Sequence, residues 1–249
     1  MASARPYGLN HRRVNQLLFK AKSLTAVSGR VSFFAGEFIG RSYQPNPLIG
    51  SIDKAEVFTA SLDGFDCVTY IETVLALARS FTAEQFAGNL RQIRYEGGRV
   101  EWKRRNHYMT SWIRNNIRAG LIARVPMGDV PIVARKRTLG VLRGIPAQTA
   151  LIRCAPKSFI RRIEPFLRTG DIICFVSTRS GLYVFHAGLI ERGEAEAALR
   201  HASRSHGAVV EQRLSDFLRS NRMSGMIVVR PKEIDVRLAG ADRRAAAAI

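Results

Sequence analysis

The stretch DGFDCVTYIETVLALARS, residues 63–80, runs from a polar turn into a predicted helix that opens with a cysteine. If the helix begins near Asp66, five apolar residues recur at helical spacing and form one stripe that faces a core: Cys67, Ile71, Val74, Leu75 and Ala78. Unpaired N–H groups and the helix dipole stabilise a thiolate in the first turn, so we expect a lowered pKa for the Cys67 thiol. The alternative is that Cys67 is a small buried core residue.

Length and composition limit the fold and the classes of site. The chain has 249 residues, of which 46% are hydrophobic, enough to bury one sizeable core. No run approaches the roughly 18 to 20 apolar residues that cross a bilayer, and the first residues lack the pattern of a secretory signal. Three cysteines without a CxxC pair argue against a disulfide scaffold and a thiolate zinc site. We therefore expect no metal, no cofactor and no membrane span.

The chain is strongly basic, with 39 Lys and Arg against 20 Asp and Glu and a net charge of +19. Such a charge favours anionic partners, so a nucleic-acid or anionic-surface binding module is the main competing class. Basic clusters at 103–105, 135–137 and 161–162 support that class. The sequence nevertheless contains no zinc-finger spacing, no aromatic RNA-binding strand motif and no convincing helix-turn-helix. An anionic polymer of the cell wall would suit the same basic surface.

The first half of the chain is predicted to be helical. Residues 12–40 show apolar residues at helical spacing, with Gly29 as the expected interruption, and a loop with two prolines follows. After the cysteine helix, Thr82 and Gln85 form a capping-box pattern for a helix that should stop at Gly97 and Gly98. A further helix is expected to end near Gly120.

The second half consists of short apolar runs separated by turns, which predicts strands. These runs are DVPIVARKRTLGV, GDIICFVST, GLYVFHAGLIER, AALRHASRS, GAVVEQRL and SGMIVVRP. Helices followed by strands favour an α+β fold with an antiparallel sheet. We divide the chain into an N-terminal helical extension (1–40), a catalytic domain (41–235) and a flexible tail (236–249).

A nucleophilic cysteine needs a base within hydrogen-bond reach, and that base is usually an oriented histidine. His186 lies among strand-forming residues, from where it could reach Cys67, and His201 should occupy the next strand beside it. Ser203 or His206 would replace His201 as the orienting group if the strand register slips. His201 and His206 could instead be surface residues or a weak pair of metal ligands. Their spacing, without acidic or cysteine neighbours, is poor evidence for a zinc site.

Several motifs together resemble a known family. The segments FDCVTYIETVLALA, GDIICFVSTRSGLYVFHAGLIE, LRHAS and GAVVE are similar to the bacterial N-acetylmuramoyl-L-alanine amidase-like family within the NlpC group of papain-like cysteine hydrolases. The resemblance spans about residues 38–230 and rests on four short motifs: Asp66-Cys67, Gly170-Asp171, His186 to Ile190, and His201 to Ser203. It implies a papain-like fold with the nucleophile at a helix N-terminus packed on the antiparallel sheet.

The resemblance also implies roles for these residues. Cys67 would be the nucleophile, His186 the base and later the acid, and His201 the group that orients His186. The reaction would pass through a thioester and cleave an amide bond of a peptidoglycan stem peptide, either between muramic acid and L-alanine or after D-glutamate. An inactive member of the fold, used as a binding domain, is a further alternative.

Substrate contacts are expected near the nucleophile and in the segment EWKRRNHYMTSW. Asp66, Arg105 and Tyr108 are our candidates, although Arg105 could equally belong to a solvated basic face and Tyr108 to the core. The substrate would be peptidoglycan or a muropeptide. The resemblance favours the cell envelope, whereas the absence of a visible signal leaves the cytoplasm open, and the sequence does not predict an oligomeric state.

Overall fold

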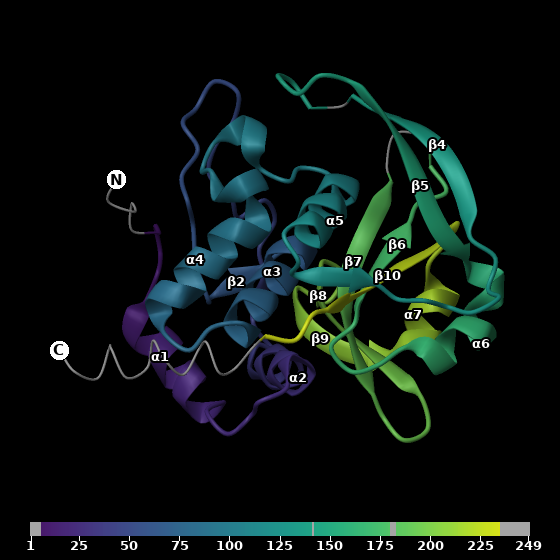
Figure 1. Cartoon of the computed structure of the whole chain (residues 1–249), viewed down its shortest axis with the longest axis horizontal. Helices are drawn as coiled ribbons and strands as arrows, with labels where there is room; N and C mark the ends of the chain where they lie inside the picture. Colours follow the sequence, from purple (N-terminus) through teal and green to yellow (C-terminus); the bar gives the residue numbers. More distant parts are fainter. Residues whose placement is uncertain (1–5, 141, 180–182, 235–249) are drawn as a thin grey trace.

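The helix predicted at the cysteine is present as α3 (Cys67–Ala78), and it lies in the middle of the molecule (Figure 1). The computed structural model describes residues 6–140, 142–179 and 183–234. Every residue of α3 from Thr69 to Ala78 is buried, because the sheet covers one side and helices α2 (Val27–Glu37) and α4 (Ala83–Arg94) cover the other. The sequence predicted a single buried stripe, so the observed helix is more enclosed than expected.

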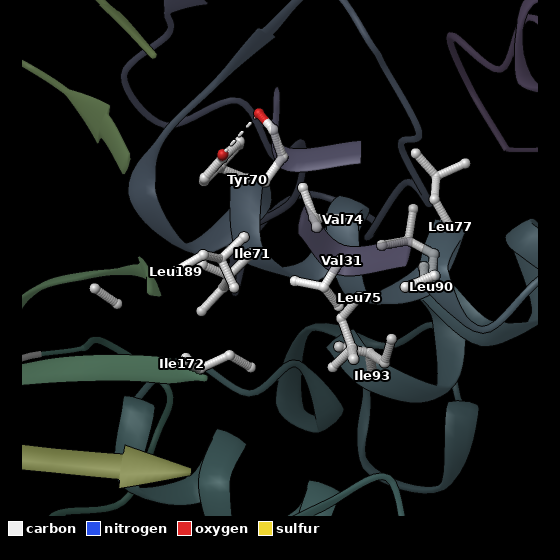
Figure 2. Close-up of a cluster of buried hydrophobic side chains, with 14 of the residues drawn as sticks. Val31, Tyr70, Ile71, Val74, Leu75, Leu77, Leu90, Ile93, Ile172 and Leu189 are labelled. Carbon is white, nitrogen blue, oxygen red and sulfur yellow. Dashed lines mark hydrogen bonds between the residues drawn. The ribbon is translucent and has the colours of Figure 1, made fainter. Parts of the chain in front are cut away.

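Figure 2 shows how side chains from several elements close around α3. Ile71 lies beside Leu189 and Ile172 of the sheet, whereas Leu75 lies near Val31 and Ile93 of the neighbouring helices. Burying apolar area of this extent is the main stabilising contribution to such a core.

Both ends of α3 have partners for their free backbone groups. At the N-terminus, the Asp66 side chain accepts hydrogen bonds from the N–H groups of Val68 and Thr69. At the C-terminus, the buried Arg30 guanidinium donates to the carbonyls of Ala78 (2.8 Å) and Leu77 (3.3 Å). A buried helix without such partners would leave polar groups unpaired at a cost of about 1 to 3 kcal/mol each.

The remaining helices of the first half agree with the prediction except at one glycine. They are α1 (His11–Lys20), α2 (Val27–Glu37), α4 (Ala83–Arg94) and α5 (Met109–Arg118). The expected interruption at Gly29 was wrong: Gly29 lies inside α2, and the chain turns between α1 and α2 instead. Thr82 caps α4 as predicted, but Gln85 bonds the N–H of Phe81 rather than that of Thr82.

The second half supplies most of a large, mostly antiparallel sheet, as predicted. The sequence did not predict its strands at Ser42–Tyr43, Gly64–Phe65, Ile122–Arg124 and Gln148–Pro156. Its order in the described part of the chain is β2-β1-β9-β8-β7-β6-β10-β5-β4, with β3 also paired to β10, and only β1 and β2 pair in parallel. The strands are β1 (Ser42–Tyr43), β2 (Gly64–Phe65), β3 (Ile122–Arg124), β4 (Val133–Leu139), β5 (Gln148–Pro156), β6 (Ile172–Val176), β7 (Val184–Arg192), β8 (Ala197–Ser203), β9 (Ala208–Arg213) and β10 (Gly225–Pro231).

Helices cover both faces of the sheet, which gives three layers (Figure 1). Two helices that the sequence did not predict, α6 (Ile160–Ile163) and α7 (Leu214–Ser220), lie on the face opposite α3. Strand side chains alternate accordingly: Cys174 of β6 packs in the core around α3, whereas Phe175 packs against Phe217 of α7. This alternation decides which strand residues face the α3 side.

The predicted Gly170-Asp171 pair turns the chain into β6. Gly170 has φ +89°, and a Cβ there would lie 3.1 Å from Cα of Ser28, so both the conformation and the space favour glycine. Asp171 is fully buried and forms an ion pair with Arg230 at 2.7 Å. These contacts connect the start of β6 to α2 and β10.

The proposed division into segments is only partly within the described residues. Val14 of α1 and Phe34 of α2 belong to the same core cluster as α3, so the N-terminal helices pack directly on the centre of the fold. The predicted tail, 236–249, lies outside the described residues.

Candidate active site

The first turn of α3 is organised by Asp66. Its Oδ1 accepts hydrogen bonds from the backbone N–H of Val68 (3.1 Å) and from both the N–H and the hydroxyl of Thr69 (2.7 Å each), and the Thr69 hydroxyl also accepts from the Asp66 N–H. This reciprocal capping box starts the helix at Cys67. Asp66 was predicted to contact substrate. One of its carboxylate oxygens, Oδ1, is used for the hydrogen bonds that cap the helix.

Cys67 is half-buried, and its thiol is surrounded by backbone N–H groups. The N–H groups of Ala187, Cys67 and Val68 all favour its thiolate form. Ala187 lies on β7 directly after His186, so the sulfur approaches the strand that carries the predicted base. Converging N–H groups of this kind also stabilise an oxyanion next to a nucleophile.

The expected lowering of the Cys67 pKa was wrong. Burial raises the pKa of the thiol to about 12, and the negative charge of Asp66 contributes to that rise, which together outweigh the backbone N–H groups. The helix N-terminus is therefore not enough to generate a thiolate at neutral pH. Attack by this sulfur requires a base that removes the proton during the reaction.

Tyr43 is a neighbour of Cys67 that the sequence analysis missed. Burial and the nearby charges of Cys67 and Asp66 raise the pKa of its phenol, while Arg204 opposes the shift. Tyr43 lies on β1, which pairs with β9, and its N–H donates to the carbonyl of Gly207. A tyrosine in a predicted loop gave no signal, because only the sheet brings β1 to the start of α3.

His186 and His201 lie side by side on adjacent strands, as predicted. His186 Nε2 and His201 Nδ1 are 2.6 Å apart, and the ring of Phe217 packs against both imidazoles. The other ring nitrogen of His201, Nε2, lies 2.8 Å from Nε2 of Gln212, a residue of β9 that the sequence analysis did not single out. The three side chains line a cavity of about 590 Å³ that also includes Ser203 and Asn221.

Close approach of β7 to β8 makes this histidine contact possible. A Cβ at Gly188 would lie 2.7 Å from Cδ1 of Leu199, 2.9 Å from the carbonyl of Arg200 and 3.0 Å from Cβ of His201. Glycine at this position is therefore needed for the two strands to sit at their observed separation. The small residues after His186 are consistent with this packing requirement.

The structure does not join Cys67 to His186 by a hydrogen bond among the described residues. Ala187 packs in the core around α3, whereas His186 is paired across the strands with Phe175 and stacks on Phe217, on the α7 side. A β-bulge between β6 and β7 lies at this point and interrupts their regular register. The N–H that faces the sulfur thus belongs to the residue after His186, and the imidazole is directed away from α3.

Arg105 and Tyr108 lie next to a second, smaller cavity of about 140 Å³. Arg105 forms an ion pair with Glu56 at 3.1 Å and stacks over the Trp102 ring. The Tyr108 hydroxyl is buried without a hydrogen-bond partner in the described structure, and its ring packs edge-on against Tyr183. Neither residue lines the histidine cavity, and their substrate contacts stay a prediction.

The other predicted alternatives have ordinary structural roles. Cys174 is fully buried in β6, where burial raises the pKa of its thiol, and Cys154 is buried in β5. His206 is exposed, and its Nδ1 lies 2.8 Å from the Ser203 hydroxyl. The residue beside His186 is therefore His201, and neither Ser203 nor His206 takes that place. Within the described residues, no group of three or more His, Cys, Asp or Glu could hold a metal ion.

A known family model matches most of the chain. The AmiA-like family, described as N-acetylmuramoyl-L-alanine amidase-like, matches residues 33–226. The chain belongs to this family. The matched residues include α3 and the strands β7, β8 and β9, which carry His186, His201 and Gln212. No match was found among curated protein sequences.

Solved structures share the AmiA-like fold. A Legionella pneumophila protein of the DUF1460 family superposes with a TM-score of 0.78 at 20% identity, covering 89% of this chain and 94% of its own. A Bacteroides uniformis N-acetylmuramoyl-L-alanine amidase gives 0.72 at 24% identity, covering 83% and 99%. A Bacteroides fragilis protein provisionally assigned as a xylanase gives 0.69 at 27% identity, covering 79% and 98%.

None of the helices in the described part of the chain has the length and hydrophobicity that a membrane span requires.

Proposed function

We propose that this AmiA-like protein is a peptidoglycan amidase that uses Cys67 as a nucleophile. The observation that carries the proposal is the position of Cys67: it opens a capped helix, with the N–H groups of Ala187, Cys67 and Val68 directed at its sulfur. Nucleophilic cysteines in hydrolases need such an environment to stabilise the charge that develops during attack. Family membership supports hydrolysis of an amide bond.

His186 is the proposed general base. Burial lowers the pKa of His186 to about 4, while the thiol pKa is raised to about 12, so both groups are neutral before substrate binds. We propose that His186 Nδ1 takes the thiol proton as sulfur attacks the carbonyl carbon. The same proton then passes to the departing amine nitrogen, and water hydrolyses the resulting thioester.

This mechanism requires His186 to approach Cys67 when substrate binds. Catalytic hydrogen bonds are often long or absent in the free enzyme and form only in the complex with substrate. The β-bulge beside His186, where the register of β6 and β7 is irregular, supports such a movement. Tyr43, which neighbours the thiol, would donate a hydrogen bond to the oxyanion.

We further propose a papain-like arrangement, in which the nucleophile helix packs on the antiparallel sheet that carries the base. Support comes from the contacts of α3 with β7 and β8 and from the order cysteine, histidine, histidine along the chain. The proposed bond is the amide between muramic acid and L-alanine, since the family and the Bacteroides uniformis neighbour carry that description. Asp66, Arg105 and Tyr108 are the proposed substrate contacts.

Digestion of muropeptides and intact sacculi tests the proposal. Wild-type protein and the Cys67→Ala variant are incubated with each substrate, and the products are separated by chromatography and identified by mass. We expect wild type to release free stem peptides that begin with L-alanine, and Cys67→Ala to release none. Fragments cut after D-glutamate would instead assign an endopeptidase.

Cys154→Ala is the matched control, because it removes a buried thiol far along the chain from Cys67. It should cleave like wild type. Equal cleavage by Cys67→Ala and wild type would remove the cysteine from the mechanism. No cleavage of either substrate by wild type, together with tight binding of sacculi or nucleic acid, would favour a binding module.

A further inference from the structure

Gln212 extends the histidine pair into a chain of three polar side chains. His186 Nε2 lies 2.6 Å from His201 Nδ1, and His201 Nε2 lies 2.8 Å from Nε2 of Gln212. Gln212 comes from β9, the strand next to the one that carries His201. All three side chains line the same cavity, although His201 itself is buried.

With Nε2 of Gln212 facing His201, the contacts allow one arrangement of protons. An amide nitrogen can only donate, so Gln212 donates to His201 Nε2, and the single proton of neutral His201 lies on Nδ1. That proton is donated to His186 Nε2, which leaves the proton of neutral His186 on Nδ1. In this arrangement no nitrogen of His186 is free to accept a proton from a nucleophile.

Rotation of the Gln212 amide by 180° reverses every donor in the chain. The carbonyl oxygen Oε1 then takes the place of Nε2 and accepts from His201 Nε2–H. His201 Nδ1 becomes an acceptor for His186 Nε2–H, and His186 Nδ1 is left unprotonated. The Gln212 side chain has no other hydrogen bond in the described structure, so this rotation breaks no further contact.

We propose that Gln212 is a positioning residue whose amide orientation selects the tautomer of His186 and thereby switches His186 between an inactive form and a general base. The inference rests on the proposed function only for the role of His186 as base. Histidine tautomers are commonly set by the hydrogen bond that the other ring nitrogen makes. Here that control acts through one intervening imidazole.

Charge around the pair supports a switch of tautomer rather than of protonation. Burial, together with the neighbouring His186 and His206, lowers the pKa of His201 to about 3. The groups packed against the pair from β6 and α7 are Phe175 and Phe217, which carry no charge. Both imidazoles are therefore neutral at neutral pH, and the position of one proton on each ring is the remaining variable.

Two substitutions of Gln212 by side chains of similar length distinguish the two tautomers of His186. Gln212→Glu offers only acceptor oxygens, and Gln212→Met offers no hydrogen bond. Tautomers are read from long-range ¹H–¹⁵N correlation spectra of protein labelled with ¹⁵N-histidine, at pH 8. We expect Gln212→Glu to hold the His186 proton on Nε2, and Gln212→Met to leave a mixture or the proton on Nδ1.

Activity provides a second, independent readout. We expect kcat of Gln212→Met on muropeptide to fall on the order of 100-fold with little change in KM, and Gln212→Glu to recover part of that loss, because a wrong tautomer removes the base without removing substrate binding. Glu211→Gln is the control: its side chain pairs with Arg200 instead, and it should retain wild-type kcat.

The two proposals can fail separately. An identical His186 tautomer in Gln212→Glu and Gln212→Met would overturn the switch, even if both variants cleave muropeptide. Tautomers that respond to Gln212 in a protein that cleaves no substrate would retain the switch and reject the amidase function. If Gln212→Met does not fold, the same comparison is made between wild type and Gln212→Glu, and an unchanged tautomer again rejects the switch.

Discussion

At the scale of single residues, Asp66 has two opposite effects on Cys67. It caps the helix that holds the cysteine in place, and its charge disfavours the thiolate form of Cys67 that the proposed reaction passes through. A short carboxylate is one of the best N-cap residues, so the position favours an acidic or amide side chain whatever the chemistry. The raised pKa of the Cys67 thiol does not prevent attack if a base removes the thiol proton during the reaction itself.

Replacing Asp66 by asparagine separates the two effects. The Asp66→Asn variant keeps the capping oxygen but removes the charge, so we expect the Cys67 pKa to fall and alkylation by iodoacetamide at pH 8 to become up to about tenfold faster. In wild type the alkylation rate should keep rising through pH 10, because the thiol pKa is about 12. Rates are measured from pH 7 to 10 by mass spectrometry of the Cys67 peptide. Unchanged rates in the variant would contradict a charge effect of Asp66.

At the scale of elements, the histidine pair depends on how closely β7 and β8 approach. The motif after His186 contains Gly188, and its hydrogen atom faces Leu199, the carbonyl of Arg200 and the Cβ of His201. No local rule of strand formation requires glycine here, since glycine weakens strand interiors. Glycine is required at position 188 because a side chain there would collide with the neighbouring strand β8.

We therefore expect Gly188→Ala to destabilise the fold by about 1 to 3 kcal/mol, the usual cost of overpacking, and to separate His186 from His201. Urea unfolding measures the first effect, and ¹⁵N-histidine spectra measure the second. Gly29→Ala is the control, because a Cβ in α2 meets nothing within 4 Å and alanine favours helix by up to about 1 kcal/mol. Equal stability of Gly188→Ala and wild type would show that the strands can move apart freely.

At the scale of the whole molecule, positive charge is concentrated away from the candidate nucleophile. From residue 130 to residue 163 the chain contains eight Lys and Arg and no acidic residue. This segment includes β4 and β5, which lie at the side of the molecule opposite α1 (Figure 1). Arg135 and Lys136 are exposed there. A surface of this kind would hold an anionic polymer without contributing to bond cleavage.

We expect the triple variant Arg135→Gln, Lys136→Gln, Arg137→Gln to bind sacculi at least about tenfold more weakly at low salt, with a shallower dependence on salt concentration. Binding is measured by sedimentation with sacculi in the Cys67→Ala background, which prevents digestion. The control removes the same charge elsewhere through Arg12→Gln, Lys22→Gln and Arg41→Gln. Equal weakening by both triples would assign the effect to net charge alone.

The sequence by itself determined most of the helices and strands and the order of the candidate reactive residues along the chain. The turn before Cys67 contains a capping aspartate, and the apolar runs with β-branched residues form strands, because caps and side-chain periodicity act over a few neighbouring residues. His186 and His201 could be placed on successive strands for the same reason, since a short turn makes such strands neighbours. The missed helices α6 and α7 are short, four and seven residues, which leaves too few turns for a clear periodic signal.

Only the tertiary structure decided the environment of these groups. It raised the Cys67 pKa through burial, brought Tyr43 to the thiol from a distant strand, turned His186 toward α7 and placed Gln212 against His201. Desolvation, strand register and β-bulges depend on contacts between residues far apart in the chain, and a local pattern contains no information about them. Short motifs therefore indicate the candidate reactive residues, while the proton affinities and orientations of their side chains depend on packing.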